Sequence, residues 1–409
     1  MPEQAVPDVL APAALGPVRL RNRTIKAATY ENRARRGLVT DELIDFHVRH
    51  GAGGVGMTTV AYCAVAPEGR TDGNQIVWRP EAAPGLRRLT EAVHARGAAV
   101  SAQVGHSGPV ADSTRTKLSA LGPSKSRNLM SLRTIKAATT ADLDRVVSAH
   151  GEAARMAAET GFDAVEIHLG HNYLASSFLS PRLNKRTDAY GGCLANRARL
   201  ALRIMRAVRE AVGDRIAILA KLNMDDGVPG GFWLDEAIEV ARWLEGEGTV
   251  DALEMTAGSS LLNPMYLFKG AAPVREFAGV MPQPLRAGVK LIGGRFLREY
   301  PYQDGYLLED ARQIRAAVDL PMVLLGGITN RAIMDTAMHE GFQFVAMGRA
   351  LLREPDLVDR IAAEPDARSL CNHNNRCMVT IFTGSRCVLV PRAETGGPAH
   401  GTASTDSRG

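Results

Sequence analysis

The sequence predicts a (β/α)8 TIM barrel, an α/β fold in which eight parallel strands close into a cylinder surrounded by helices. Three observations support this fold class. Short apolar runs of strand length alternate with longer amphipathic stretches of helical length, which is typical of βα units. The alternation repeats eight times, as a closed barrel requires. The chain has 409 residues, of which 45% are hydrophobic, and this is ample for a barrel of roughly 250 residues with loop insertions.

The expected strands are short apolar runs, each brief enough for one buried strand. In chain order they cover Thr24–Thr29, Gly54–Val60, Ala98–Val104, Phe162–His168, Ile216–Leu222, Ala252–Thr256, Met322–Leu325 and Phe342–Met347. The expected helices follow these strands one by one. They cover Thr40–His50, Glu81–Arg96, Thr140–Thr160, Leu194–Val212, Leu234–Gly246, Leu307–Val318, Arg331–Gly341 and Asp356–Ala363.

Two long segments interrupt the alternation. Residues Ser107–Arg133 are rich in Gly, Pro, Ser and basic residues and predict a long loop, whereas Asn263–Tyr306 mix Pro, Gly, Arg and aromatic residues. Insertions of this length form lids or substrate walls, or are simply tolerated, and the sequence leaves both open. The tail Pro391–Gly409 has no apolar pattern and predicts disorder. We therefore expect one barrel domain over residues 1–390 and a disordered tail over 391–409.

Composition argues against several classes of protein. The net charge is only +5, and Lys and Arg are scattered, which favours a solvated surface over nucleic-acid binding. No apolar run reaches the roughly 18 residues of a membrane span. Residues Met1–Gly16 lack a basic start and a long apolar core, so we expect no secretory signal. Five cysteines are few for this length and fit a reducing cytoplasm. We expect a cytoplasmic protein with a small-molecule substrate, and we leave homo-oligomerisation open.

Proton-handling side chains cluster after the fourth expected strand. His168 and His171 follow the apolar run Phe162–Ile167 at once, and Tyr173 comes two residues later. In parallel α/β folds, ligands bind at the carboxyl ends of the strands. We therefore predict that these three side chains are part of an active site.

The order of residues from Glu166 to Arg199 resembles that of the old yellow enzyme family of flavin-dependent oxidoreductases. The resemblance lies in the His-x-x-His pair, the following Tyr, and the phrase FLSPRLNKRTDAYGG before a helix. Further matching pieces extend the resemblance from about Leu15 to Val388. The chain resembles a single-domain member of the family, related to the barrel domain of 2,4-dienoyl-CoA reductase. These pieces are Leu20–Ala28, Gly53–Val60, Pro67–Arg70, Gln103–Gly108, Leu325–Ile328 and Met347–Ala350.

The resemblance implies that the barrel holds FMN. The carboxamide of Gln103 offers both a donor and an acceptor to the edge of the flavin ring. Lys221 would stabilise the negative charge of reduced flavin, with an ordinary ion-paired lysine as the alternative. Arg349 would add a charge-assisted contact to the phosphate, where glycines let the backbone approach. The full set of implied cofactor-binding residues is Ala28, Thr29, Ala61, Gln103, Lys221, Gly326, Gly327, Gly348 and Arg349.

The resemblance also implies roles for the substrate-binding residues. His168 and His171 would donate hydrogen bonds to a substrate oxygen, and Tyr173, protonated at neutral pH, would supply a proton. Tyr30 would contact the substrate, in a region where many relatives have Thr or Cys. Asn172 stands where the family usually has Gly, and Pro109 where it has Arg.

The implied enzyme is an NAD(P)H-dependent ene-reductase. Hydride would pass from NAD(P)H through the flavin N5 to the β-carbon of an α,β-unsaturated carbonyl compound. Three alternatives remain: an FMN-dependent desaturase or isomerase, a flavin-binding protein without turnover, and a metal-dependent barrel hydrolase. The last is disfavoured, because no Asp, Glu or Cys with clear metal-ligand spacing lies near the histidine pair.

A cysteine-containing segment near the end of the chain resembles an iron–sulfur motif of the larger dienoyl-CoA reductase branch. Cys371, Cys377 and Cys387 match that motif, but Asn374 stands where it has another cysteine. Three thiolates are one fewer than a cluster normally needs. We therefore expect structural cysteines with no bound metal, in a segment, 370–388, that packs across the edge of the barrel.

Overall fold

The computed structural model describes residues 6–128, 133–281, 283 and 285–391. Its centre is a closed barrel in which all neighbouring strands are parallel. This confirms the predicted fold class, and each barrel strand overlaps a predicted one. In barrel order the strands are β3 (Thr24–Lys26), β4 (Met57–Ala64), β5 (Ala99–Gly105), β9 (Ala164–Leu169), β10 (Ala217–Asn223), β11 (Ala252–Thr256), β12 (Met322–Leu325) and β13 (Phe344–Met347).

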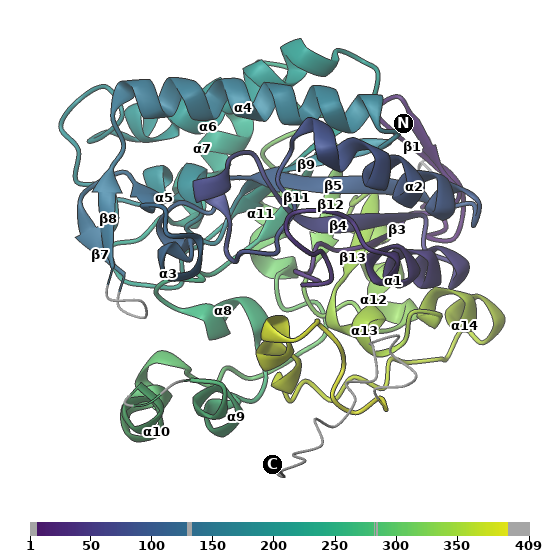
Figure 1. Cartoon of the computed structure of the whole chain (residues 1–409). Coiled ribbons are helices and arrows are strands. Elements are labelled where there is room, and N and C mark those ends of the chain that lie inside the picture. Colours follow the sequence, from purple (N-terminus) through teal and green to yellow (C-terminus); the bar gives the residue numbers. More distant parts are fainter. Residues whose placement is uncertain (1–5, 129–132, 282, 284, 392–409) are drawn as a thin grey trace, which may run out of the picture.

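Helices surround the barrel (Figure 1). The eight predicted helices are present as α1 (Asp41–Ala52), α2 (Ala83–His94), α4 (Thr140–Glu159), α6 (Leu194–Val212), α7 (Leu234–Gly246), α11 (Leu308–Arg315), α12 (Arg331–His339) and α14 (Leu357–Ala363). Helix α4 shows why they begin where they do. The Thr139 side chain accepts a hydrogen bond from the backbone N–H of Asp142, whose side chain accepts one from the backbone N–H of Thr139. This capping box satisfies N–H groups that the first turn leaves without partners.

One end of the barrel is closed by apolar side chains. The hairpin of β1 (Ala13–Leu15) and β2 (Val18–Leu20), which the sequence analysis missed, contributes Leu15 and Leu20 to a buried cluster. Met57, Ala164 and Ala217, the first residues of their strands, belong to the same cluster. The hairpin therefore seals the amino-terminal end of the barrel, and the polar side chains inside the barrel lie toward the other end.

The segment after β5 is more ordered than predicted. It contains η3 (Gly108–Val110), α3 (Ser113–Thr116), β6 (Leu121–Gly122) and β7 (Ser126–Arg127), and both strands pair with β8 (Thr134–Ala137). The prediction of a plain loop over Ser107–Arg133 is wrong for these parts, because two-residue strands leave no apolar run in a sequence. Residues 129–132 of that prediction lie outside the described residues.

The second insertion and the C-terminal segment lie on the same side of the barrel (Figure 1). The insertion forms α8 (Pro264–Phe268), α9 (Val274–Gly279) and α10 (Leu285–Phe296). The C-terminal segment follows α13 (Arg349–Arg353) and α14 and contains η4 (Arg376–Phe382). Both contact the barrel rim, so we propose that they are parts of the barrel domain. Of the tail predicted to be disordered, 392–409 lie outside the described residues.

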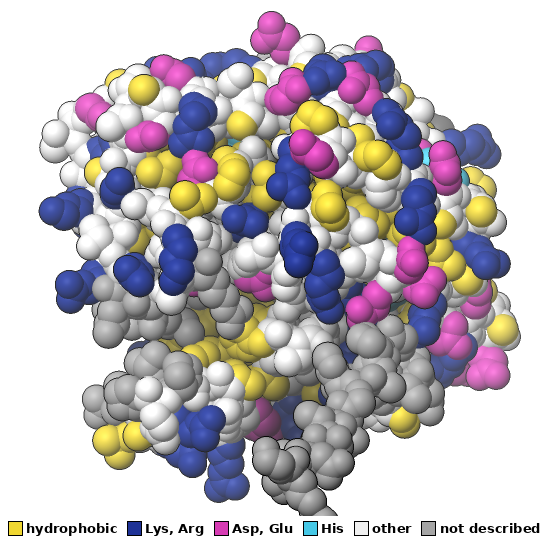
Figure 2. All heavy atoms as spheres, viewed as in Figure 1, with side chains coloured by type: hydrophobic (Ala, Val, Ile, Leu, Met, Phe, Trp, Pro, Cys, Tyr) yellow, Lys and Arg dark blue, Asp and Glu magenta, His cyan; other side chains and the backbone are white. Residues whose placement is uncertain are grey.

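The surface matches the scattered charge of the sequence. Figure 2 shows Lys and Arg side chains spread over one face among Asp and Glu. Among the helices that the structure describes, none combines the length and the apolar character needed to cross a membrane.

Candidate active site

A pocket of about 290 Å³ lies at the carboxyl ends of the barrel strands. Its volume is close to the lower end of the range of roughly 300–1,000 Å³ that is usual for ligand sites. The structure brings all but one of the predicted site residues together in its lining. They are Ala28, Thr29, Tyr30, Gln103, His168, His171, Tyr173, Lys221, Gly326, Gly327, Gly348 and Arg349.

The exception is Ala61, which does not line this pocket. Its backbone N–H donates to Glu31 Oε2 at 3.0 Å, and its neighbour Tyr62 is the pocket residue of β4. Successive strand residues point to opposite faces, and the register of β4 against β5 shifts between Val60 and Cys63. In this irregular part of the strand Tyr62 takes the lining position, and the contact of Ala61 with the cofactor stays a prediction.

The two histidines are in contact at the end of β9. His168 Nε2 lies 3.2 Å from His171 Nδ1, and His171 Nε2 lies 2.8 Å from Thr256 Oγ1. Burial lowers the pKa of His168 well below its usual value and lowers that of His171 to about 3, and Lys221 adds to both shifts. Both imidazoles are therefore neutral at pH 7. Each then carries one N–H, and one of the two is used in the contact between the rings, so a bound oxygen would have to replace that contact to receive hydrogen bonds from the pair.

A left-handed turn places the second histidine beside the first. His171 and Asn172 have φ angles of 59° and 57°. Asn tolerates this conformation better than most residues, which accounts for Asn172 at a position where the family usually has Gly. The Asn172 amide also donates to Asp226 Oδ1 at 2.9 Å. The turn brings the chain to Tyr173, which directly precedes α5 (Leu174–Leu179).

Tyr173 packs against His168 at the pocket wall. Their ring centroids are 4.5 Å apart, and the ring of Tyr62 is 5.3 Å from that of Tyr173. Burial raises the pKa of Tyr173 to about 12. The phenol is therefore protonated at physiological pH and can act as a proton donor.

Lys221 both lines the pocket and forms ion pairs. Its Nζ lies 2.9 Å from Glu166 Oε1 and 2.6 Å from Glu254 Oε1, and all three side chains are buried. Gln103 Nε2 donates to Glu166 Oε1 at 2.6 Å. The two interpretations of Lys221 in the sequence analysis are thus compatible, because a paired ammonium forms part of the pocket floor.

A second buried lysine was missed by the sequence analysis. Lys26 is completely buried, and its Nζ donates to Thr29 Oγ1 at 2.9 Å and to Glu31 Oε1 at 3.0 Å. The signal that could have revealed it is a lysine within an expected buried strand, because lysine is almost never fully buried unless it is paired. Its ammonium holds the Thr29 hydroxyl at the pocket surface.

Two glycines shape the far end of the pocket. Gly326 and Gly327 have φ angles of 96° and 78°, which L side chains rarely adopt, and a Cβ on Gly327 would lie 2.5 Å from the backbone nitrogen of Gly305. Arg349 lies beside them, with its Nη1 donating to Lys269 O at 2.9 Å and to Asn375 Oδ1 at 2.5 Å. A guanidinium has five N–H groups, so donors remain for an anion.

The residues of the pocket fit FMN. Gln103 and Lys221 present a donor and a cation where the edge of the flavin ring would need them, and the glycine pair and Arg349 suit a phosphate. A Cβ on Gly327 would clash with the backbone of residues 303–305, so only glycine lets the chain turn here beside the pocket. Nothing in this donor set conflicts with a flavin.

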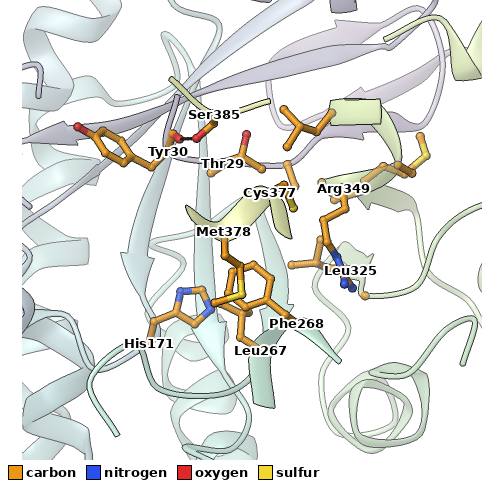
Figure 3. Close-up of a pocket in the computed structure, with 18 of the residues that line it drawn as sticks. Thr29, Tyr30, His171, Leu267, Phe268, Leu325, Arg349, Cys377, Met378 and Ser385 are labelled. Carbon is orange, nitrogen blue, oxygen red and sulfur yellow. Dashed lines mark hydrogen bonds between the residues drawn. The ribbon is translucent and has the colours of Figure 1, made fainter. Parts of the chain in front are cut away.

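The remaining wall comes from segments far apart in the sequence. Leu267 and Phe268 of α8 line the pocket opposite Thr29, and Met378 of η4 points toward them (Figure 3). Tyr302 of the insertion stacks on His373 of the C-terminal segment, with centroids 3.3 Å apart. The insertion therefore forms a pocket wall, which decides between the two possibilities that the sequence left open.

The C-terminal cysteines lie beside this wall. Cys371, Cys377 and Cys387 line a small adjoining cavity of about 20 Å³, and Cys377 also lines the main pocket. Burial raises the pKa of Cys371, and it raises the pKa of Cys377 to about 11. Among the described residues, no three His, Cys, Asp or Glu side chains are arranged to hold a metal ion.

Comparisons with known proteins identify the family of the chain. Residues 8–259 match the NADH:flavin oxidoreductase / NADH oxidase family. The chain is 50% identical over 383 residues to the 4,4'-dithiodibutanoate disulfide reductase of Rhodococcus erythropolis, covering 94% of this chain and 95% of that one. It is 29% identical over 367 residues to a multifunctional alkene reductase/demethylase of Caballeronia cordobensis, covering 88% of this chain and 50% of the relative.

Solved structures show the same fold. A 2-naphthoyl-CoA reductase complex superposes with a TM-score of 0.81 at 24% identity, covering 96% of this chain and 58% of that one. An old yellow enzyme homologue from Zymomonas mobilis gives 0.70 at 21% identity, covering 90% and 96%. The chain therefore spans nearly all of some relatives and about half of others.

Proposed function

Because the chain belongs to the NADH:flavin oxidoreductase / NADH oxidase family and is therefore a flavin-dependent oxidoreductase, we propose that it uses NAD(P)H to reduce a small electrophilic substrate. The first candidate substrate is an α,β-unsaturated carbonyl compound, of which the activated C=C bond is reduced. The observation that carries this proposal is the contact between a neutral histidine pair and a protonated phenol in one pocket. When bound, FMN would accept a hydride from NAD(P)H and deliver it to the substrate.

The protein's own residues supply the rest of the chemistry. Gln103, Lys221 and Thr29 hold the ring edge, while Gly326–Gly327 and Arg349 hold the phosphate. His168 and His171 donate to the substrate oxygen and stabilise the negative charge that develops there during reduction. Tyr173 provides the proton that completes the reduced product.

Disulfide reduction is a second candidate. It is favoured by the relative named for that activity, which is 50% identical over nearly the whole chain. A disulfide that receives a hydride and one proton gives two thiols. The neutral histidines can donate hydrogen bonds to the leaving thiolate and Tyr173 can supply its proton, so the same site serves either substrate.

The test is a two-substrate assay on the purified protein. The visible spectrum establishes whether FMN is bound, and anaerobic mixing with NADH or NADPH measures its reduction. The reduced protein is then mixed with a cyclic enone or with 4,4'-dithiodibutanoate. Reoxidation by the enone supports ene-reduction, and reoxidation by the disulfide alone supports the second candidate. A protein that binds no FMN contradicts both.

A further inference from the structure

The floor of the pocket rests on a buried group with more acids than bases. Lys221 of β10 lies between Glu166 of β9 and Glu254 of β11, at 2.9 Å and 2.6 Å. The three side chains are at most 3% exposed. If both carboxyls were ionised, this group would carry a net charge of −1.

Neighbouring charges do not compensate for this surplus. The nearby ammonium of Lys26 is paired with Glu31 at 3.0 Å and is balanced by it once Glu31 is ionised, above the pKa of about 7 to which burial raises that carboxyl. The nearby rings of His168 and His171 are neutral, because burial depresses the pKa of both. An uncompensated charge in such a place is expensive, and a buried group normally changes its protonation instead.

The hydrogen bonding indicates which carboxyl is neutral. Glu166 Oε1 accepts from both Gln103 and Lys221, as a carboxylate does. By contrast, Glu254 has only the 2.6 Å contact of its Oε1 with Lys221, while Glu254 Oε2 and Glu166 Oε2 are buried without a hydrogen-bond partner among the described residues. The two carboxyl groups nevertheless contact each other, and the Glu166 carboxylate helps burial to raise the pKa of Glu254 to about 8.

We propose that Glu254 is protonated near neutral pH and shares its proton with Glu166. This proton sets the charge of the buried group next to bound FMN, and the charge in turn sets how readily the flavin is reduced. The proton gives Glu166 Oε2 a donor and leaves Lys221 balanced by a single carboxylate. Glu254 is a positioning residue, since it does not line the pocket and acts through Lys221. The inference rests on the proposed binding of FMN.

The direction of the effect follows from the charges. Loss of the proton would add a negative charge next to Lys221, which would disfavour the negative charge of a reduced flavin. Above the pKa of Glu254, reduction by hydride therefore also draws one proton from water onto the carboxyl pair. The hydride brings two electrons and one proton to the flavin, and the additional proton, taken from water, neutralises Glu254.

The first test is the reduction potential of the FMN-loaded protein at pH values on both sides of 8. We expect the wild type to take up one additional proton per two electrons on the alkaline side. Glu254→Gln, which keeps the size and removes the titration, should lose this additional uptake. The control is Glu239→Gln, an exposed carboxylate of α7 paired with Arg242. Identical pH dependence in wild type and Glu254→Gln overturns the proposal.

The second test needs no cofactor. Infrared spectra of the apoprotein with isotope-labelled glutamate report protonated carboxyl groups by their C=O band. We expect a buried glutamic acid at pH 7 that ionises as the pH passes about 8, and its band should be lost in Glu254→Gln but kept in Glu31→Gln, because burial also raises the pKa of Glu31, to about 7. Absence of such a group contradicts the inference even if FMN binds. Conversely, a protein with this group that refuses FMN contradicts the proposed function alone.

Discussion

Replacing Tyr173 with Phe removes one hydroxyl and keeps the ring. The ring contributes the contacts with His168 and Tyr62, at centroid distances of 4.5 Å and 5.3 Å, so the pocket should retain its shape. What is lost is a donor that burial keeps protonated, with a pKa of about 12. General acids typically accelerate a reaction about 10²–10⁴-fold, which corresponds to roughly 3–5 kcal/mol of barrier at 1.36 kcal/mol per tenfold change.

The two half-reactions should respond differently. We expect the oxidation of reduced protein by an enone to slow by about 10²–10⁴-fold, while reduction by NAD(P)H changes little, because hydride acceptance needs no proton from Tyr173. Anaerobic stopped-flow absorbance measures each half separately. The matched control is Tyr62→Phe, since the Tyr62 hydroxyl donates to Gly69 O at 3.5 Å. Equal slowing of both half-reactions in Tyr173→Phe would refute its role as proton donor.

Three further predictions concern stability, measured by urea unfolding. Asn172→Ala should be less stable than Asn172→Gly by about 1–2 kcal/mol, because only glycine is free of strain at this positive φ; the reverse order would contradict this account of the turn. Lys26→Met should cost about 3–5 kcal/mol by leaving Glu31 buried without its cation, and adding Glu31→Gln should recover part of that loss. His150 has a pKa lowered by burial to about 4. Below the unfolded pKa of about 6.5, the unfolded chain binds a proton at His150 that the folded protein does not bind. The free energy of unfolding of the wild type, relative to that of His150→Gln, should therefore fall by about 1.4 kcal/mol per pH unit between about pH 6.5 and pH 4.

The barrel was predictable because it repeats one simple pattern. Strands buried on both faces are nearly continuous apolar runs, and Ala217–Asn223 and Ala164–Leu169 keep this pattern although each contains two polar residues. The hairpin at Ala13–Leu20 and the short strands near Leu121 were not predictable in the same way. The hairpin is held by packing of Leu15 and Leu20 on the end of the barrel, and the short strands by pairing with β8, and neither depends on local periodicity.

The site was predictable only in part. The order of residues around His168 and Tyr173 was specific enough to place them in one pocket, where the structure also puts them. The partners beneath the pocket were not predictable, because a Glu in a strand sequence carries no sign of what faces it. Glu254 lies opposite Lys221 through the register of β10 and β11, and a shift of one residue would send it to the other face of the barrel.

The wall of the pocket separates binding of the cofactor from choice of substrate. Residues suited to FMN come from barrel strands and the turns that follow them, whereas the opposite wall comes from α8, the end of the insertion and the C-terminal segment. Arg349 joins the two, since the side chain that suits the phosphate also bonds Lys269 O and Asn375 Oδ1. We therefore expect substitutions at Phe268 or Met378 to change substrate preference while leaving the barrel floor intact. Changes at Asn375 should instead disturb the wall and the phosphate end together, because they act on the same guanidinium.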